Sequence, residues 1–219
     1  MQLTDRLAQQ KFHPILPAEI LHGRHYVFQL AKPSEFSHLN PKDTQAMTEH
    51  SHKLLQHHQA VLGIGQYGEQ RQLYEHALFE DRCIHLGIDL TAATGTVIFA
   101  PMAATVHSFK NNNQPGDYGA TIILEHQLEG CRFYTLYGHL SLKSLDNLEP
   151  NKSIAEGQQI GEIGSEVENG GWPPHLHFQI IIDINDHQGD YPGVCSLKDK
   201  KKMLKNCPNP NLMLGLKLT

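Results

Sequence analysis

The segment at residues 173–182 carries two histidines two positions apart, His175 and His177, in the run PPHLHFQIII. Its β-branched apolar end predicts a strand, and on a strand side chains two positions apart point the same way. The two imidazoles therefore face one space, while Leu176 and Phe178 take the opposite face and require a core. A buried strand with paired histidines suits one wall of a metal site, although an isolated His-x-His pair is more often satisfied by ordinary hydrogen bonds.

Two further segments add groups of the same kind. His85 and Asp89 lie four residues apart in the run HLGID, and on a straight strand their α-carbons would be about 13 Å apart. Gly87 is where the chain could bend to bring them together. His139 ends a third candidate strand. A zinc ion held by two histidines and one aspartate keeps a position open for water and makes that water more acidic, so these segments favour a catalytic metal site.

Four motifs, in this order and approximate spacing, resemble those of the lysostaphin and LytM-type zinc metallopeptidases. They are HLGID at residues 85–89, YGHLS at 137–141, GQQIGEIG at 157–164 and HLHF at 175–178. The resemblance covers residues 82–182, and the ordered set is far more specific than any one motif. It implies an antiparallel β core, the duplicated hybrid motif, with a zinc cleft on its sheet.

The resemblance also implies which residues bind metal and which assist catalysis. One zinc ion would be bound by His85, Asp89 and His177, and a zinc-bound water would attack the carbonyl of a peptide bond. His139 and His175 would be the catalytic histidines: one takes the proton and the other steadies the oxyanion, and the sequence leaves open which does which. The substrates implied are the peptide cross-links of peptidoglycan.

Departures from the family pattern concern the cleft and the cellular setting. The loop at residues 165–174, SEVENGGWPP, is longer than usual and carries Trp172, which with Tyr137 is a candidate for the substrate cleft. Gln179 stands where the family often has glutamate. This residue is expected to contact a metal ligand and not the metal itself, so the set of ligands is unchanged. The motifs look most like an intracellular peptidase-like module also found fused to kinase-like and aminotransferase domains, which points to a small amide substrate.

Three functions therefore stay open from the sequence. The first is a zinc-dependent endopeptidase acting on peptidoglycan-type cross-links, and the second is an intracellular hydrolase of a small amide. The third is a binding module of the same fold that recognises wall fragments or a partner protein without hydrolysis. Because disabled family members are expected to lose at least one of the five chemical residues and all five are present, hydrolysis is favoured over binding alone.

Composition excludes several other classes. The formal net charge is -5, which gives no electrostatic basis for nucleic-acid or anionic-membrane partners. No stretch of about 18 apolar residues and no classical signal segment occur, so a cytoplasmic location is expected, with a periplasmic or secreted one if export uses another route. Four cysteines without Cys-x-x-Cys spacing are expected to be reduced thiols. The oligomeric state is not indicated.

The chain is expected to form one main β domain with additions at both ends. Short β-rich runs separated by Gly, Pro and Asn predict a mainly β fold, an antiparallel sandwich or barrel-like core, over residues 81–188. Residues 1–80 are expected to form an α+β appendage with a short strand and a helix over 41–62, and residues 189–219 a tail. Residues 63–68 match Gly-x-Gly-x-x-Gly, but a helix is expected before them, so they are interpreted as a helix exit and not as a dinucleotide site.

Overall fold

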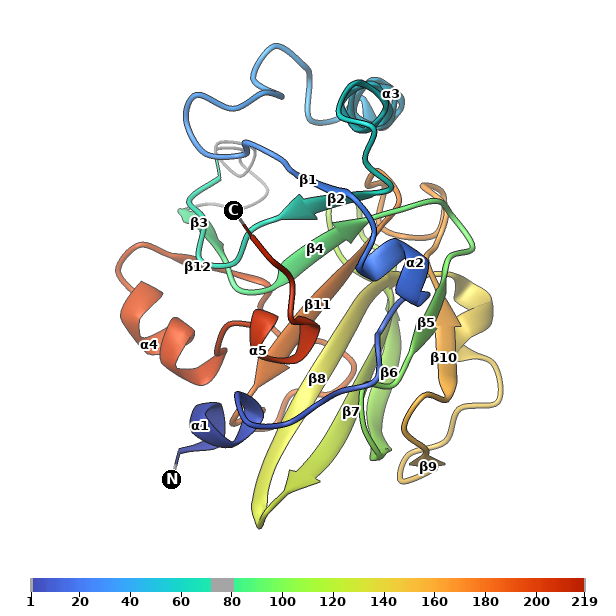
Figure 1. Ribbon diagram of the computed structural model, residues 1–219, viewed down its shortest axis with the longest axis vertical. Helices are drawn as coiled ribbons and strands as arrows, with labels where there is room; N and C mark the ends of the chain where they lie inside the picture. Colours follow the sequence, from blue (N-terminus) through green and yellow to red (C-terminus); the bar gives the residue numbers. More distant parts are fainter. Residues whose placement is uncertain (1, 72–80, 219) are drawn as a thin grey trace.

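The protein is built on an open sheet of eight strands (Figure 1), seen in a computed structural model that describes residues 2–71 and 81–218. The strand order is β1-β2-β4-β11-β8-β7-β6-β9, with β1 parallel to β2 and every other neighbouring pair antiparallel. Two further pairs, β5 with β10 and β3 with β12, flank it. The expected mainly β fold is confirmed, as a large mixed sheet that does not close into a barrel in the described part of the chain.

The strands and helices have the following bounds. The strands are β1 His25–Val27, β2 Leu62–Gly65, β3 Arg82–His85, β4 Ile88–Thr91, β5 Val97–Phe99, β6 Ala104–Asn112, β7 Gly119–Leu128, β8 Cys131–Leu140, β9 Ser153–Ile154, β10 Gln159–Glu162, β11 His175–Ile181 and β12 Val194–Ser196. The helices are α1 Leu3–Leu7, α2 Ala18–Leu21, α3 Thr44–His57, the 3₁₀ helix Leu142–Leu145, α4 Lys200–Asn206 and α5 Asn211–Leu214.

Strand β11 lies inside the sheet, and all seven of its residues are buried. Leu176, Phe178 and Ile180 belong to the main apolar core on one face of the sheet. His175 and His177 alternate with them and therefore point to the other face. The expected division of this strand between a core face and a histidine face is confirmed.

The two ends of the chain complete the main core. Leu7 and Leu16 from the N-terminal segment and Leu214 from α5 are buried in the same apolar cluster as the central strands. Figure 1 shows α1 and α5 beside the sheet and α3 beyond its β1–β2 edge. Strands β1 and β2 lengthen the sheet itself. The proposed division of the chain at residues 80 and 188 stays a prediction.

Helix α3 is shorter than the expected helix over 41–62. It begins at Thr44 because the side chain of Asp43, and not an earlier residue, accepts a hydrogen bond from the backbone N–H of Ala46 at 3.0 Å. It ends at His57, and Gln59 then takes a left-handed backbone with φ of 53° that leads the chain away from the helix.

The glycine-rich segment after this helix is a strand and not a helix exit. Leu62–Gly65 forms β2 and pairs with β4, with Gly63 opposite Thr91 and Gly65 opposite Asp89. The expectation of a loop here is therefore wrong, because the flanking Leu62 and Ile64 are fully buried in the core.

A buried histidine far from the candidate site makes stability depend on pH. Burial, partly offset by a hydrogen bond with Ala103, lowers the pKa of His126 to about 4. The unfolded chain therefore binds a proton that the folded chain does not between about pH 6.5 and 4, and folding stability falls as the pH is lowered through this window. We expect His126→Gln to reduce this loss by about 3 kcal/mol.

The measurement is urea unfolding of the metal-free protein at pH 7 and at pH 4. His22→Gln, at an exposed position, is the control and should leave the pH dependence unchanged. An unchanged dependence in the His126 variant would contradict the assignment of a neutral, buried imidazole.

Candidate metal centre and active site

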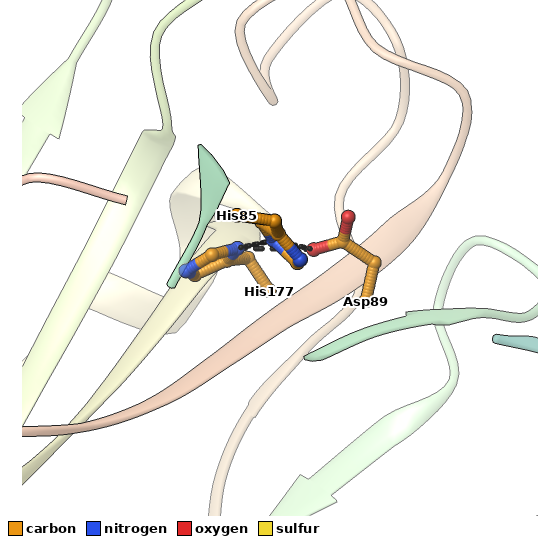
Figure 2. Close-up of side chains that lie close together, drawn as sticks. All are labelled: His85, Asp89 and His177. Atoms are coloured by element: carbon orange, nitrogen blue, oxygen red, sulfur yellow. Dashed lines mark hydrogen bonds and ion pairs between the residues drawn. The ribbon is translucent and has the colours of Figure 1, made fainter. Parts of the chain in front are cut away.

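Three side chains from separate strands converge on one point (Figure 2). His85 Nε2 lies 3.2 Å from Asp89 Oδ1 and 3.1 Å from His177 Nδ1, and the latter two atoms are 3.0 Å apart. Zinc bonds of 2.0–2.1 Å in a tetrahedron separate ligand atoms by about 3.3 Å. The triangle therefore has the donor types and nearly the size that a zinc ion requires.

The backbone that forms this triangle explains the HLGID spacing. His85 ends β3, which pairs with β12, while Asp89 lies in β4 of the large sheet, directly opposite His177 on β11. At Gly87 the chain passes from the β3–β12 pair to the large sheet. His85 and Asp89 therefore do not lie on one straight strand. A Cβ atom at Gly87 would lie 2.5 Å from Cε1 of His177, so only glycine leaves room for that imidazole.

Each ligand histidine is oriented through its other ring nitrogen. His85 Nδ1 lies 2.9 Å from the carbonyl oxygen of Gln66, and His177 Nε2 lies 2.9 Å from Oε1 of Gln179. In the tautomers that carry protons on these nitrogens, the ring nitrogens of the triangle are acceptors. Gln179 donates from Nε2 to the carbonyl of Pro192 at 3.1 Å, a bond that a glutamate carboxylate could not donate.

Sequence reasoning missed a buried arginine beside the triangle. Arg71 Nη1 lies 2.6 Å from Asp89 Oδ2, its Nε lies 3.2 Å from Glu69 Oε2, and its Nη2 lies 2.9 Å from His85 Nδ1. A Cβ at Gly65 would lie 2.5 Å from Nη2, so this glycine admits the guanidinium. Nothing in the local sequence distinguishes Arg71, because its position depends on the pairing of the segment after β2 with β3, where the Arg71 N–H donates to the carbonyl of Cys83 at 2.9 Å.

The arginine and burial together determine the charges in the cluster. Burial and the charge of Arg71 lower the pKa of His85 to about 4, so this imidazole is neutral near pH 7. Burial raises the pKa of Asp89, but the positive charge of Arg71 and the contacts with His85 and His177 hold it well below its usual value. Asp89 is thus a carboxylate and His85 a neutral imidazole, the forms that bind zinc.

We expect Arg71→Met to destabilise the metal-free protein by about 3 kcal/mol or more, because two buried carboxylates lose their cation. Urea unfolding in the presence of a chelator measures this change. Arg24→Met, which alters an exposed arginine bonded to Gln59, should change stability by less than about 0.5 kcal/mol. A loss below 1 kcal/mol for Arg71→Met would show that the pairing does not compensate these charges.

His139 and His175 lie next to the triangle, with ring centroids 4.2 Å apart and ring planes tilted by 38°. His139 Nδ1 lies 2.8 Å from the carbonyl of Asn169, and His175 Nδ1 lies 2.7 Å from the carbonyl of Pro173. Burial lowers the pKa of both histidines. Both rings are therefore neutral near pH 7, with Nδ1 protonated and Nε2 able to accept a proton.

The long loop at residues 165–174 is held together by one buried side chain. Asn169 is fully buried, donates from Nδ2 to the carbonyl of Trp172 at 3.0 Å, and accepts from the Trp172 N–H at 3.0 Å. Trp172 donates from Nε1 to the carbonyl of Asp117 at 3.2 Å, and its ring lies 6.2 Å from that of His139. Trp172 lines the cavity, and its assignment to a substrate cleft stays a prediction.

Tyr137 lies elsewhere. It is fully buried in the main core, bonded to Thr135, and does not line the cavity, which is contrary to a role in the substrate cleft. The reason is an irregularity near the end of β8. The pairing with β7 shifts between Ala120 and Ile122, and His139 has φ of 63°. The usual alternation is therefore interrupted between Tyr137, which faces the core, and His139, which faces the cavity.

The cluster opens into a cavity of about 460 Å³. All three triangle residues and both neighbouring histidines line it, together with Arg71, Tyr118 and Trp172. Its volume is in the range of small-molecule and peptide-residue sites. The geometry therefore provides a metal-binding triangle, two neutral imidazoles beside it and space for a substrate.

A family comparison agrees with this combination of fold and site. The model of peptidase family M23 matches residues 83–190, about half of the chain. The chain belongs to peptidase family M23, as the lysostaphin- and LytM-type motifs indicate. No similar sequence was found among curated proteins.

The similar solved structures include the following three, each with a TM-score below 0.5. A zinc-containing peptidase from Vibrio cholerae is 21% identical, with 52% of this chain and 31% of that chain covered and a TM-score of 0.40. Helicobacter pylori Csd3 is 24% identical, with 64% and 36% covered and a TM-score of 0.38. The catalytic domain of the antimicrobial peptidase lysostaphin from Staphylococcus simulans is 22% identical, with 55% and 80% covered and a TM-score of 0.38. The chain thus spans about a third of the first two proteins.

No helix in the described ranges is both long enough and apolar enough to cross a bilayer.

Proposed function

We propose that the protein is a zinc-dependent hydrolase of amide bonds, with His85, Asp89 and His177 as the ligands. The observation that carries this proposal is the triangle of three donor atoms with edges of 3.0–3.2 Å, beside two neutral histidines in one cavity. Zinc in such a site supplies a Lewis acid and lowers the pKa of a water molecule towards neutrality.

His139 and His175 are the proposed catalytic histidines. Each has Nδ1 bonded to a backbone carbonyl, which fixes the ring and leaves Nε2 as the acceptor. One Nε2 accepts the proton of the attacking water and can return it to the leaving amine nitrogen. The other ring, when protonated, stabilises negative charge on the substrate oxygen. Either assignment fits the two nearly equivalent hydrogen bonds.

The substrate proposed from the family is a peptide, with peptidoglycan-type cross-links as the first candidate and small amides as the second. The test is zinc analysis of the purified protein together with a cleavage screen of glycine-rich peptides, muropeptides and small amides. We expect one zinc per chain and cleavage that stops when a chelator is added and returns with zinc. Zinc binding with no cleavage of any compound, but measurable binding of one of them, would favour the non-hydrolytic alternative.

A further inference from the structure

The N-terminal region forms one wall of the cavity that contains the proposed zinc ligands. The lining residues from this region up to α3 are Phe28, Leu30, Phe36, Met47 and Ser51, and none of them carries a charge. The first four, here called the apolar wall, are buried and pack in one cluster with Leu55. The cavity therefore has a polar end at the triangle and an apolar side supplied by a different part of the chain.

The Gly-x-Gly pattern of β2 explains how this wall approaches the site. Gly63 and Gly65 lie opposite Thr91 and Asp89, so their missing side chains would point to the cavity face of the sheet. A Cβ at Gly63 would lie 2.4 Å from Cε2 of Phe28. The absence of side chains at Gly63 and Gly65 thus leaves space on the cavity face of β2. The Phe28 ring occupies this space at Gly63, and Arg71 occupies it at Gly65.

The register gives the separation between the two ends of the cavity. His175 pairs with Thr91, and Thr91 pairs with Gly63, beneath the Phe28 ring. Neighbouring strands are about 4.8 Å apart, so the backbone of Gly63 lies about 10 Å from that of His175. One residue of an extended chain spans about 3.5 Å and its side chain several more, so the wall is within reach of a residue adjoining the bond at the triangle.

The wall is also held in place from the opposite side of the cavity. Thr44 donates from Oγ1 to the carbonyl of Gly171 at 2.6 Å, and Thr48 donates to Oε1 of Glu166 at 2.6 Å. These bonds tie α3, which carries Met47, to the loop that carries Trp172. The apolar wall and the loop are therefore fixed relative to each other before any substrate binds.

We propose that the apolar wall is a specificity subsite that binds an apolar side chain, of the leucine or phenylalanine kind, next to the amide bond that is cleaved. This inference rests on the proposed hydrolase function and narrows its substrate class. An apolar side chain that packs against this uncharged wall is removed from water, and this favours binding. Glycine has no side chain to bury and therefore adds no such binding free energy. Amides with a bulky apolar residue are therefore preferred over glycine-rich peptides.

The test measures equilibrium binding of two uncharged probes, N-acetyl-L-phenylalaninamide and N-acetylglycinamide, to the full chain with and without zinc. Calorimetry or NMR titration should show at least about tenfold tighter binding of the phenylalanine probe. Met47→Ala should reduce this ratio at least about fivefold. Leu55→Ala is the matched control, since Leu55 lies on the same helix and in the same cluster but does not line the cavity.

If Met47→Ala fails to fold, Met47→Gln keeps the length of the side chain and should reduce the ratio as well. Equal binding of the two probes would overturn the inference, as would an equal effect of Met47→Ala and Leu55→Ala. The outcome is separable from that of the hydrolase proposal. Zinc-dependent cleavage without a preference would overturn only the subsite, whereas a preference changed by Met47→Ala in a protein that binds no zinc would support the subsite and contradict the hydrolase.

Discussion

Asp89→Ala is expected to reduce zinc from one ion per chain to a trace and to abolish amide hydrolysis. Asp89 supplies the carboxylate of the triangle, whose other two members are histidines. Its Oδ1 lies within 3.2 Å of both ligand nitrogens. Loss of a direct ligand should weaken zinc binding by more than the 10–100-fold typical of a lost outer partner. Metal analysis after dialysis, together with the cleavage assay, measures both effects.

A second effect of Asp89→Ala must be separated from metal loss. The variant also leaves the buried Arg71 with Glu69 but without Asp89, which destabilises the fold. Urea unfolding of metal-free Asp89→Ala measures this effect apart from zinc loss, with Glu69 as the carboxylate that still pairs with Arg71. Asp117→Ala, which removes another carboxylate lining the cavity, should keep one zinc per chain. Stoichiometric zinc in Asp89→Ala would contradict the ligand assignment.

His139→Ala is expected to lower kcat by about 10²–10⁴-fold while zinc stays bound. A positioned general base or acid contributes a factor of this size, and His139 is not part of the triangle. The variant should therefore separate catalysis from metal binding, which Asp89→Ala cannot do. His175→Ala should show a loss of the same kind, and the pH dependence of the two variants identifies the base.

The control for these variants is His187→Gln, which alters another histidine lining the cavity, one that packs against Tyr191. Its kcat should stay within about twofold of the unmodified protein. If His139→Ala kept more than a tenth of the original kcat, His139 would be a structural residue and not a catalytic one.

The sequence was sufficient for the parts of the site that depend on local periodicity. Alternation along β11 correctly placed His175 and His177 on one face, because the strand is regular and its other face is apolar. The bend at Gly87 was also foreseen, since His85 and Asp89 could not meet on a straight strand. The mainly β fold of residues 81–188 was predicted from short β-rich runs separated by turn residues.

The remainder depended on pairing between distant segments, which local patterns do not encode. Arg71 enters the site because the segment after β2 pairs with β3, where Gln70 lies opposite Ile84 and the Arg71 N–H donates to the carbonyl of Cys83. The pairing of β2 with β4 makes the Gly-x-Gly segment a strand, although the helix expected before it indicated a helix exit. Tyr137 was misplaced because a shift in the β7–β8 pairing interrupts alternation just before His139.

The most direct measurement is an anomalous-scattering map at the zinc absorption edge, from crystals of the protein loaded with one equivalent of zinc. The account predicts a single strong peak about 2.0–2.2 Å from His85 Nε2, Asp89 Oδ1 and His177 Nδ1. A map with no peak at these three atoms, or with the zinc bound elsewhere while Arg71 still pairs with Asp89, would contradict it.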